Sequence, residues 1–348
     1  CGKCSYLCPV KTNLMARKKA NYPLIEGLEI TTLAAEGKAM GRWNDVVVFV
    51  PMTVPGDVVD VQIRCKRRRY MVGYVVRYVH KSPKRAEPFC EHFGVCGGCK
   101  WQNLPYDEQL AFKTDQVRDQ LTRIGKIELP EIAPCLGSAQ TRFYRNKLEF
   151  TFADRRWLTR EEIAADAKIE AGPAAGFHIP DMFDKVLDIR LCWLQPEPSN
   201  AIRLETKRFC IEHGYTFHNA REHTGLMRNM TVRTASTGEV MVIVVFGSDD
   251  RPRITALLDH LVVKFPEITS LFYIVNTKFN DSTADLDPVL YHGKDHIVEG
   301  MEGLHFKVGP KSFYQTNSAQ AYELYKVARE FAELKPDEVL YDLYTGTG

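Results

Sequence analysis

The stretch "DVVDVQIRCKRRRYMVGYVVRYV", residues 57 to 79, holds two runs rich in Val, Ile and Tyr with a short cationic segment between them. Branched and aromatic residues of this kind favour strands, whereas the four consecutive cations at 66 to 69 suit a solvent-exposed turn. The stretch therefore predicts two strands joined by a basic turn.

The same pattern continues towards the N-terminus. "LEITTL" at 28 to 33 and "DVVVFV" at 45 to 50 have strand composition, and Gly37, Gly41 and "PGD" at 55 to 57 interrupt the chain between the runs. Short strands punctuated in this way are typical of a small β-barrel. We expect such a barrel over about residues 28 to 79.

Positive charge is concentrated in this region. Nine Lys or Arg residues and no Asp or Glu lie between Val61 and Ala86, with three tyrosines interleaved among them. Cations neutralise phosphates and aromatic rings stack on bases, so the run is a candidate RNA contact, while a solvated polar strand face is the alternative. The candidate RNA-binding residues here are Lys66, Arg67, Arg68 and Arg69.

Composition limits the class of protein. The chain has 348 residues, 45% hydrophobic and 26% charged, which fits two or three folded domains. It shows no apolar run of about 18 residues and no signal-peptide pattern, so we expect a cytoplasmic protein with no membrane partner. In a reducing compartment its ten cysteines favour metal ligation or catalysis over disulfides. We interpret residues 1 to 14, which include "CGKCSYLCPV", as sequence upstream of a start at Met15.

Three cysteines cluster in "CEHFGVCGGCK", residues 90 to 100, at the spacing C-x5-C-x2-C. Both zinc and iron–sulfur clusters take thiolates, but no second C-x2-C pair follows, whereas an iron–sulfur cluster accepts one distant fourth ligand. The candidates for that ligand are Cys135, Cys192 and Cys210. Cys192 is the best placed, at a junction between a strand and a helix that Ser199 or Asn200 could cap. We expect Cys210 in the core and His92 in a surface loop.

Two resemblances follow from these residues. "AAEGKAMGR", "VFVPMTVPGD" and the basic run resemble a TRAM domain, a small OB-like RNA-binding barrel, over residues 24 to 82. The succession of this barrel, "CEHFGVCGGCKWQNLPYDEQLAFKTDQV" and a lone distant cysteine resembles the bacterial 23S ribosomal RNA uracil-5-methyltransferases. The resemblance implies a four-iron, four-sulfur cluster on Cys90, Cys96, Cys99 and Cys192. We set the transfer RNA members of the family aside on the understanding that they lack both barrel and cluster.

The middle of the chain alternates strand and helix patterns. "RNKLEFTF", "MRNMTVRTAS" and "EVMVIVVFG" have strand composition, and "ITALLDHLVVKF" has helical periodicity. The alternation predicts a mixed α/β domain with antiparallel pairing. For the cations of "TRFYRNK", residues 141 to 147, we favour salt bridges at a strand end over RNA contacts.

Two further motifs lie near the C-terminus. In "GPKSFYQTN", residues 309 to 317, Phe313 and Gln315 face the same way if the backbone is extended. "EVLYDLYTGTG", residues 338 to 348, predicts a strand followed by a Gly-x-Gly turn, as at the start of a Rossmann-like unit. The family resemblance implies that Gln315 and Tyr344 bind S-adenosylmethionine and that Phe313 helps to hold the target base.

These patterns predict a multidomain α/β protein. We expect an extraneous segment at 1–14, a barrel at 15–82, a central α+β iron–sulfur domain at 83–300 and the start of a methyltransferase domain at 301–348. The family adds a cysteine thiolate to C6 of uracil so that C5 attacks the methyl group, and a general base then removes the C5 proton. We expect the nucleophilic Cys and the basic Glu beyond residue 348, so that residues 1 to 348 alone are inactive and monomeric, with 23S ribosomal RNA as partner.

Two alternatives remain from the sequence. One is a non-catalytic RNA-binding protein with a structural iron–sulfur cluster. The other is a radical S-adenosylmethionine methylthiotransferase, although the C-x3-C-x2-C run of those enzymes is absent.

Overall fold

The structure is a computed structural model that describes residues 22–165, 169 and 171–347. The chain divides into two compact units, with the boundary after Arg85. No helix among the described residues is both long and apolar enough to cross a membrane. The proposed upstream segment, residues 1 to 14, lies outside the described residues.

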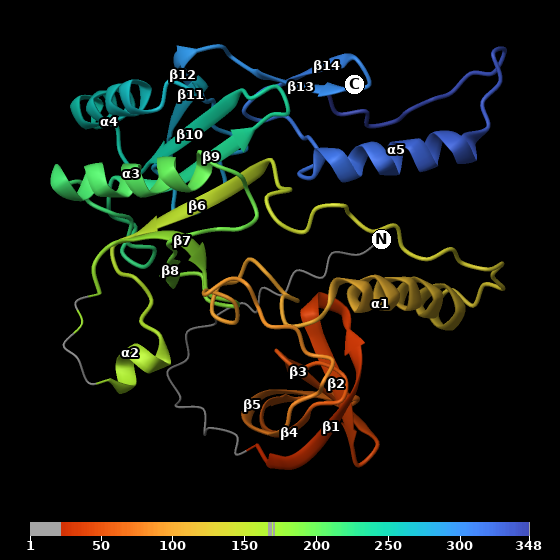
Figure 1. Cartoon of the computed structure of the whole chain (residues 1–348). Helices are drawn as coiled ribbons and strands as arrows, with labels where there is room; N and C mark the ends of the chain where they lie inside the picture. The colour runs from red at the N-terminus through yellow and green to blue at the C-terminus, as the bar shows by residue number, and fades with distance from the viewer. Residues whose placement is uncertain (1–21, 166–168, 170, 348) are drawn as a thin grey trace. The chain divides into compact units, whose positions relative to one another are not determined.

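The first unit is a closed five-stranded barrel in the order β1-β2-β3-β5-β4 (Figure 1). Its strands are β1 (Leu24–Ala34), β2 (Lys38–Trp43), β3 (Val46–Pro51), β4 (Val58–Lys66) and β5 (Tyr70–His80), and a 3-10 turn, η1 (Ala35–Gly37), joins the first two. Alternate residues such as Ile30, Val48 and Val61 are fully buried inside it. The predicted barrel is confirmed.

β2 is the strand that composition did not predict, because "KAMGRW" is neither β-branched nor strictly alternating. Gly41 makes its pairing with β1 possible. A Cβ at this position would lie 2.2 Å from the carbonyl oxygen of Glu29, so only glycine allows the two backbones to come this close.

The second unit is built on a seven-stranded sheet in the order β12-β11-β10-β9-β6-β7-β8. Only β10 and β11 pair in parallel, so the predicted mixed sheet with antiparallel pairing is confirmed. Its strands are β6 (Lys147–Ala153), β7 (Ala174–His178), β8 (Val186–Asp188), β9 (Met227–Thr234), β10 (Val240–Phe246), β11 (Ile268–Val275) and β12 (Val289–Gly293).

Two helices cover one face of this sheet, α3 (Ser199–Glu212) and α4 (Arg251–Lys264) (Figure 1). Their apolar residues join alternate residues of β6, β9 and β10 in the main core. A smaller apolar cluster uses the opposite residues of β10 and β11 together with the hairpin of β13 (Ile297–Met301) and β14 (Leu304–Val308). The remaining helices are α1 (Tyr106–Asp119), the π-helical turn η2 (Gln120–Ile124), α2 (Arg160–Ala164) and α5 (Ser318–Ala332).

The strand predicted within residues 338 to 348 does not form in the described part of this segment. Val339, Tyr341 and Leu343 are each at least three-quarters exposed. A single apolar run gains strand geometry only when a neighbour completes its hydrogen-bond ladder, and no described strand pairs with it. The strand predicted for this segment is therefore absent from the described residues.

Candidate functional site

Four cysteines line one small cavity in the second unit. Cys90, Cys96 and Cys99 come from the loop before α1, and Cys192 comes from the segment between β8 and α3. All four are free thiols, and apolar residues such as Phe177 and Ile189 line the rest of the cavity. The structure thus brings together the four residues that the family resemblance implied. Cys210 lies instead in the main core, and Cys135 lines a different cavity.

Close backbone packing fixes the loop that carries Cys96. The Gly97 amide donates to the carbonyl oxygen of His178 at 3.1 Å. A Cβ on Gly97 would lie 2.6 Å from the same oxygen, so the Gly-Gly pair lets the cysteine loop rest against the end of β7.

Asn200 fixes the backbone at Cys192. Its Oδ1 accepts from the Cys192 amide at 2.8 Å, and its Nδ2 donates to the Cys192 carbonyl at 3.1 Å. The sequence suggested Ser199 or Asn200 as a helix cap, but the N-cap position is Pro198 and no side chain caps it. The helix-cap role expected for Asn200 is therefore wrong. A side chain in the first turn of a helix can also reach back across the preceding loop, as Asn200 does to Cys192.

The cavity favours neutral thiols when no metal is present. Burial raises the pKa of Cys96 and of Cys192 to about 11 each, and it also raises the pKa of Cys90. A cation is the usual means of stabilising thiolates in such surroundings. Among the described residues, no group of three or more His, Cys, Asp or Glu is arranged to hold a single metal ion.

His92 is not the surface residue that the sequence suggested. Its side chain is only 14% exposed, lines the cysteine cavity, and accepts from the Arg190 amide at 3.0 Å through Nε2. Burial lowers the pKa of His92, which favours a neutral ring. Glu91 and Arg190 form an ion pair beside it.

The basic turn occupies the connection between β4 and β5 in the first unit. Lys66 and Arg67 to Arg69 are all exposed, and none of them has a carboxylate partner in the described chain. Tyr74 is 42% exposed, but the Tyr78 hydroxyl donates to the Met52 carbonyl at 2.9 Å. The four cations are therefore available to bind a ligand, whereas the Tyr78 hydroxyl is already used in a hydrogen bond within the barrel.

The segment with Phe313 and Gln315 lies between β14 and α5 and has no regular secondary structure. Phe313 is 71% exposed, and Gln315 is half-buried. Asn146 anchors the segment: its Nδ2 donates at 2.8 Å to the Gln315 carbonyl and also to Ser318 Oγ, and its amide donates to the Thr316 carbonyl. No local sequence pattern indicates this role of Asn146.

The C-terminal turn comes back to this segment. A Cβ on Gly346 would lie 3.9 Å from the Phe313 carbonyl oxygen, and Tyr344 is fully exposed with a φ of 71°. Residues 313 and 346 are thus neighbours in space.

The cations at 141 to 147 do not form the salt bridges that the sequence suggested. The Arg142 guanidinium lies over the Phe89 ring at 4.1 Å and the Trp193 ring at 5.3 Å, and Arg145 Nε donates to the Lys147 carbonyl. No carboxylate within the described residues pairs with Arg142, Arg145 or Lys147. Aromatic rings and carbonyls near the cysteine loop are the partners here instead.

Comparison with known proteins places these features in a family. No protein-family model matches the chain. A curated protein from Bacteroides thetaiotaomicron named "Uncharacterized RNA methyltransferase" is 58% identical over 319 residues, covering 91% of this chain and 70% of the relative. Relatives with the same description are 54% identical in Porphyromonas gingivalis and 35% identical in Chlorobaculum tepidum, where 70% and 68% of the relative is covered.

A solved structure is also similar. The Pyrococcus abyssi tRNA (uracil-54, C5)-methyltransferase in complex with S-adenosyl-L-homocysteine matches with a TM-score of 0.61 and 25% identity, over 87% of this chain and 64% of that one. Residues 86–348 are only about three-quarters of the chain, so this match extends into the barrel. On identity and coverage together, the chain belongs to the family of RNA methyltransferases to which these curated relatives belong.

Proposed function

We propose that the protein transfers a methyl group from S-adenosylmethionine to C5 of a uridine in 23S ribosomal RNA. The observation that carries this proposal is the match over 87% of the chain to an enzyme that methylates C5 of a tRNA uracil and binds S-adenosyl-L-homocysteine. Curated relatives of this chain are RNA methyltransferases, which supports the reaction class.

The cofactor is proposed to bind at Gln315 and Tyr344. The Gln315 side chain makes no hydrogen bond within the described residues, while its backbone is held by Asn146, so its amide is available and its position is fixed. Phe313 projects from the same segment as an exposed ring that can lie against a base. S-adenosylmethionine, when bound, supplies an electrophilic methyl group, and these residues would orient it and the target uracil.

The chain spans 70% of the length of its first two relatives and 64% of the solved neighbour. We therefore propose that the nucleophilic cysteine and the general base belong to the part of the family's length that is not matched here. In this proposal the thiolate adds to C6, C5 forms the bond to the methyl group, and the base takes the C5 proton as the thiolate leaves.

The choice of 23S ribosomal RNA rests on the sequence resemblance. The solved neighbour is a tRNA enzyme, and its match covers more of this chain than the second unit alone. Transfer RNA is therefore the necessary comparison substrate in any test.

The four cysteines are proposed to hold a four-iron, four-sulfur cluster. Four free thiols line one apolar cavity without forming a disulfide, and the set Cys90, Cys96, Cys99 and Cys192 matches the thiolate ligation of such clusters. A cubane is several atoms across, so its ligands stand around a cavity and do not converge on one point. The cluster would link the loop before α1 to the segment before α3, a structural role.

The reaction is tested with the protein extended to the full length of its relatives. Labelled S-adenosylmethionine is supplied with 23S ribosomal RNA or transfer RNA, and the product is digested to nucleosides. We expect 5-methyluridine in the ribosomal RNA, reduced by Gln315→Ala but not by Lys311→Ala, which changes an exposed neighbour. Label in another base, or only in transfer RNA, would contradict the reaction or the substrate respectively.

The cluster is tested by metal analysis. Protein purified without oxygen should contain about four iron and four sulfide per chain. Cys192→Ser should lose them, whereas Cys135→Ser should retain them because Cys135 lies outside the cysteine cavity. Stoichiometric zinc without sulfide would overturn the cluster.

A further inference from the structure

A second, larger cavity lies beside the cysteine site. It has a volume of about 590 Å³ and is bounded by the first turns of α1, the loops on either side of Cys99 and the first residues of α5. We name it the α1 pocket. Its volume is within the range of about 300–1,000 Å³ that is usual for small-ligand sites. Its lining includes Cys99 and Asn317 but not Phe313, Gln315 or Tyr344.

Unpaired positive charge surrounds the α1 pocket. Lys100, Lys113 and Arg145 line it, and none of the three has a carboxylate partner in the described chain. Glu87 is the one acidic residue among the described lining residues. Such an excess of unpaired cations favours a phosphate-bearing ligand.

Aromatic rings provide the second feature. Trp101, Tyr106 and Tyr144 all line the pocket. Tyr106 and Tyr144 make no ring–ring contact within the described residues, and Trp101 meets the Phe112 ring edge-on. The Trp101 Nε1 is buried and has no acceptor in that part of the chain. Aromatic rings that line a cavity and an unsatisfied donor suit a nucleobase.

Another large cavity of this unit, about 530 Å³ and named here the Arg228 cavity, provides a contrast. Most of its cations are neutralised: Arg156 pairs with Glu162, Arg221 with Asp184, and buried Arg228 with Asp281.

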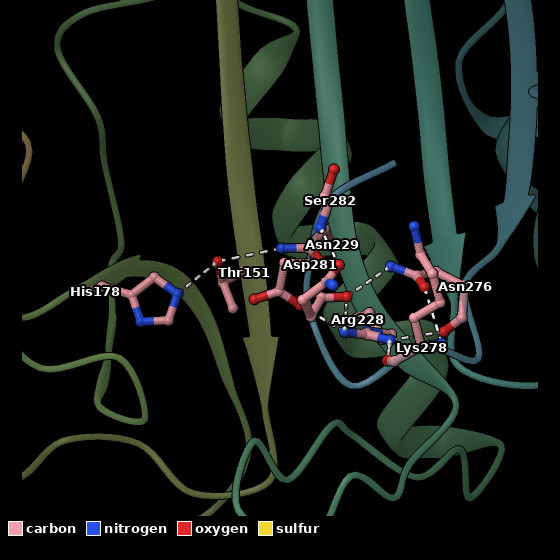
Figure 2. Close-up of polar contacts among 9 residues, drawn as sticks. Thr151, His178, Arg228, Asn229, Asn276, Lys278, Asp281 and Ser282 are labelled. Carbon is pink, nitrogen blue, oxygen red and sulfur yellow. Dashed lines mark hydrogen bonds and ion pairs between the residues drawn. The ribbon is translucent and has the colours of Figure 1, made fainter. Parts of the chain in front are cut away.

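Figure 2 shows the contacts of Arg228 in the Arg228 cavity. It donates to the carbonyls of Asn276, Lys278 and Asn280 and thereby holds the loop after β11. Beside it, hydrogen bonds link the Thr151 side chain to those of Asn229 and His178. Most cations of the Arg228 cavity are thus paired within the protein. The cations of the α1 pocket have no carboxylate partner in the described chain.

We propose that the α1 pocket binds one unstacked nucleotide of the RNA substrate, distinct from the uridine that is methylated. The base lies against Trp101, Tyr106 or Tyr144, and the flanking phosphates meet Lys100, Lys113 and Arg145. The inference rests on the proposed function only in taking RNA as the substrate. A duplex presents no free base face, so the pocket selects single-stranded or looped RNA.

The probe is a fluorescein-labelled single-stranded oligouridylate of about ten nucleotides, within the range of site sizes for single strands. Binding to the protein is followed by anisotropy at several salt concentrations. Lys100→Ala combined with Lys113→Ala should weaken binding about tenfold and reduce the salt slope by about 1.4, because each lost phosphate contact removes about 0.7. Arg155 is an exposed cation of the Arg228 cavity, and Arg155→Ala should leave the affinity and the salt slope unchanged.

Stacking is tested at Tyr144. Tyr144→Ala should weaken binding about tenfold, and Tyr144→Phe should preserve it, since the ring and not the hydroxyl meets the base. Crosslinking of a 4-thiouridine oligonucleotide to the unaltered protein does not depend on the folding of a variant. The crosslinked peptides should include residues 98–113 or Tyr144.

The outcomes separate the two proposals. If the unaltered protein binds no RNA, the proposed function fails. If it binds RNA but the Lys100/Lys113 variant keeps the same affinity and slope, or crosslinks map only to other regions, the α1 pocket is not a nucleotide site. Equal competition by duplex RNA or by polyphosphate would overturn the stacking part and reduce the pocket to a site for polyanions.

Discussion

At the scale of single residues, the cysteine cavity depends on how Cys192 is held. Its thiol and those of the 90–99 loop are far apart in sequence, and Asn200 fixes the backbone that brings them together. Asn200 is buried, with 3% of its surface exposed, so removing its amide leaves the Cys192 N–H and C=O without partners in an apolar site.

Asn200→Ala should therefore lower the free energy of unfolding by about 2 to 4 kcal/mol, the cost of two lost hydrogen bonds with buried groups left unpaired. It should also reduce iron retention, measured by metal analysis after oxygen-free dialysis. Urea titration followed by circular dichroism measures the stability. Leu204→Ala, on the exposed side of the same helix, should cost less than about 1 kcal/mol. Equal effects of the two substitutions would show that Asn200 does not fix the cysteine site.

Sequence spacing could predict part of this arrangement. Cys90, Cys96 and Cys99 lie within ten residues of one another, so they must be close in any fold. The choice of Cys192 over Cys135 and Cys210 required the family resemblance and a strand-to-helix junction. The roles of Asn200 and His92 depend on contacts across about a hundred residues or across a tight loop, which no local pattern encodes.

At the scale of elements, Asn146 links the central sheet to the segment proposed for the cofactor. It precedes β6, and the Thr234 amide at the end of β9 donates to its carbonyl at 2.9 Å. Its side chain holds Gln315 and Ser318 on the other side. The start of α5 is thereby fixed to the sheet, and Asn317 caps that helix by accepting from the Gln320 amide.

Asn146→Ala should weaken binding of S-adenosyl-L-homocysteine about thirtyfold in the full-length protein, because two hydrogen bonds of about 1 kcal/mol each no longer fix the Gln315 segment. Isothermal calorimetry measures the affinity. Asn219→Ala removes an amide contact to Asp154 elsewhere on the unit and should leave that affinity unchanged. A loss of RNA binding without a loss of cofactor binding would contradict the assignment of Asn146.

A carboxylate between α3 and α4 gives a pH prediction. The Arg208 guanidinium, aided by the His260 ring, lowers the pKa of Glu205 to about 2. A pKa that is lower in the folded state means that the contacts of ionised Glu205 stabilise the fold at pH values above about 4.5, the ordinary pKa of glutamate. This contribution is lost as the pH falls towards 2 and the carboxylate is protonated.

The free energy of unfolding should thus decrease between pH 4.5 and pH 2, and Glu205→Gln should flatten this decrease. Urea titrations at a series of pH values measure it. Glu149→Gln, which changes an exposed carboxylate without an ion pair in the described chain, should leave the slope as it is. An unaltered slope in Glu205→Gln would show that the Glu205 contacts add no stability.

The elements themselves were largely predictable. Runs rich in β-branched residues predict β1, β3, β4, β5 and β10, because their pattern matches the burial of strands in a barrel or a covered sheet. β2 forms because it pairs with β1 across Gly41, and the composition of residues 38 to 43 does not indicate this pairing. The apolar run at 338 to 343 shows the converse: composition favours a strand, but without a neighbouring strand the described residues remain irregular.

At the scale of the whole molecule, two separate units carry cations that have no carboxylate partner in the described chain. The basic turn of the barrel holds four, and the α1 pocket of the second unit holds three. A near-neutral net charge of +2 conceals both groups, because acidic residues elsewhere balance them. Charge distribution, and not net charge, points to RNA.

Replacing Lys66, Arg67, Arg68 and Arg69 with Ala should weaken binding of ribosomal RNA fragments and lower the salt slope by up to about 2.8, since each single-strand phosphate contact contributes about 0.7. Filter binding at several salt concentrations measures both. Lys38→Ala changes a barrel cation that is already paired with Glu36 and should have a smaller effect. If the slope is unchanged, the basic turn is only a solvated strand connection.

Methylation at C5 of a uridine, the reaction proposed for this protein, requires the C5 hydrogen to leave. The most direct measurement uses ribosomal RNA transcribed with uridine tritiated at C5, incubated with S-adenosylmethionine and the protein at the full length of its relatives. We predict release of tritium into water in a one-to-one ratio with methyl transfer, and no release without the cofactor. Methyl transfer without tritium release would place the methyl group on another atom and contradict the proposed methylation at C5.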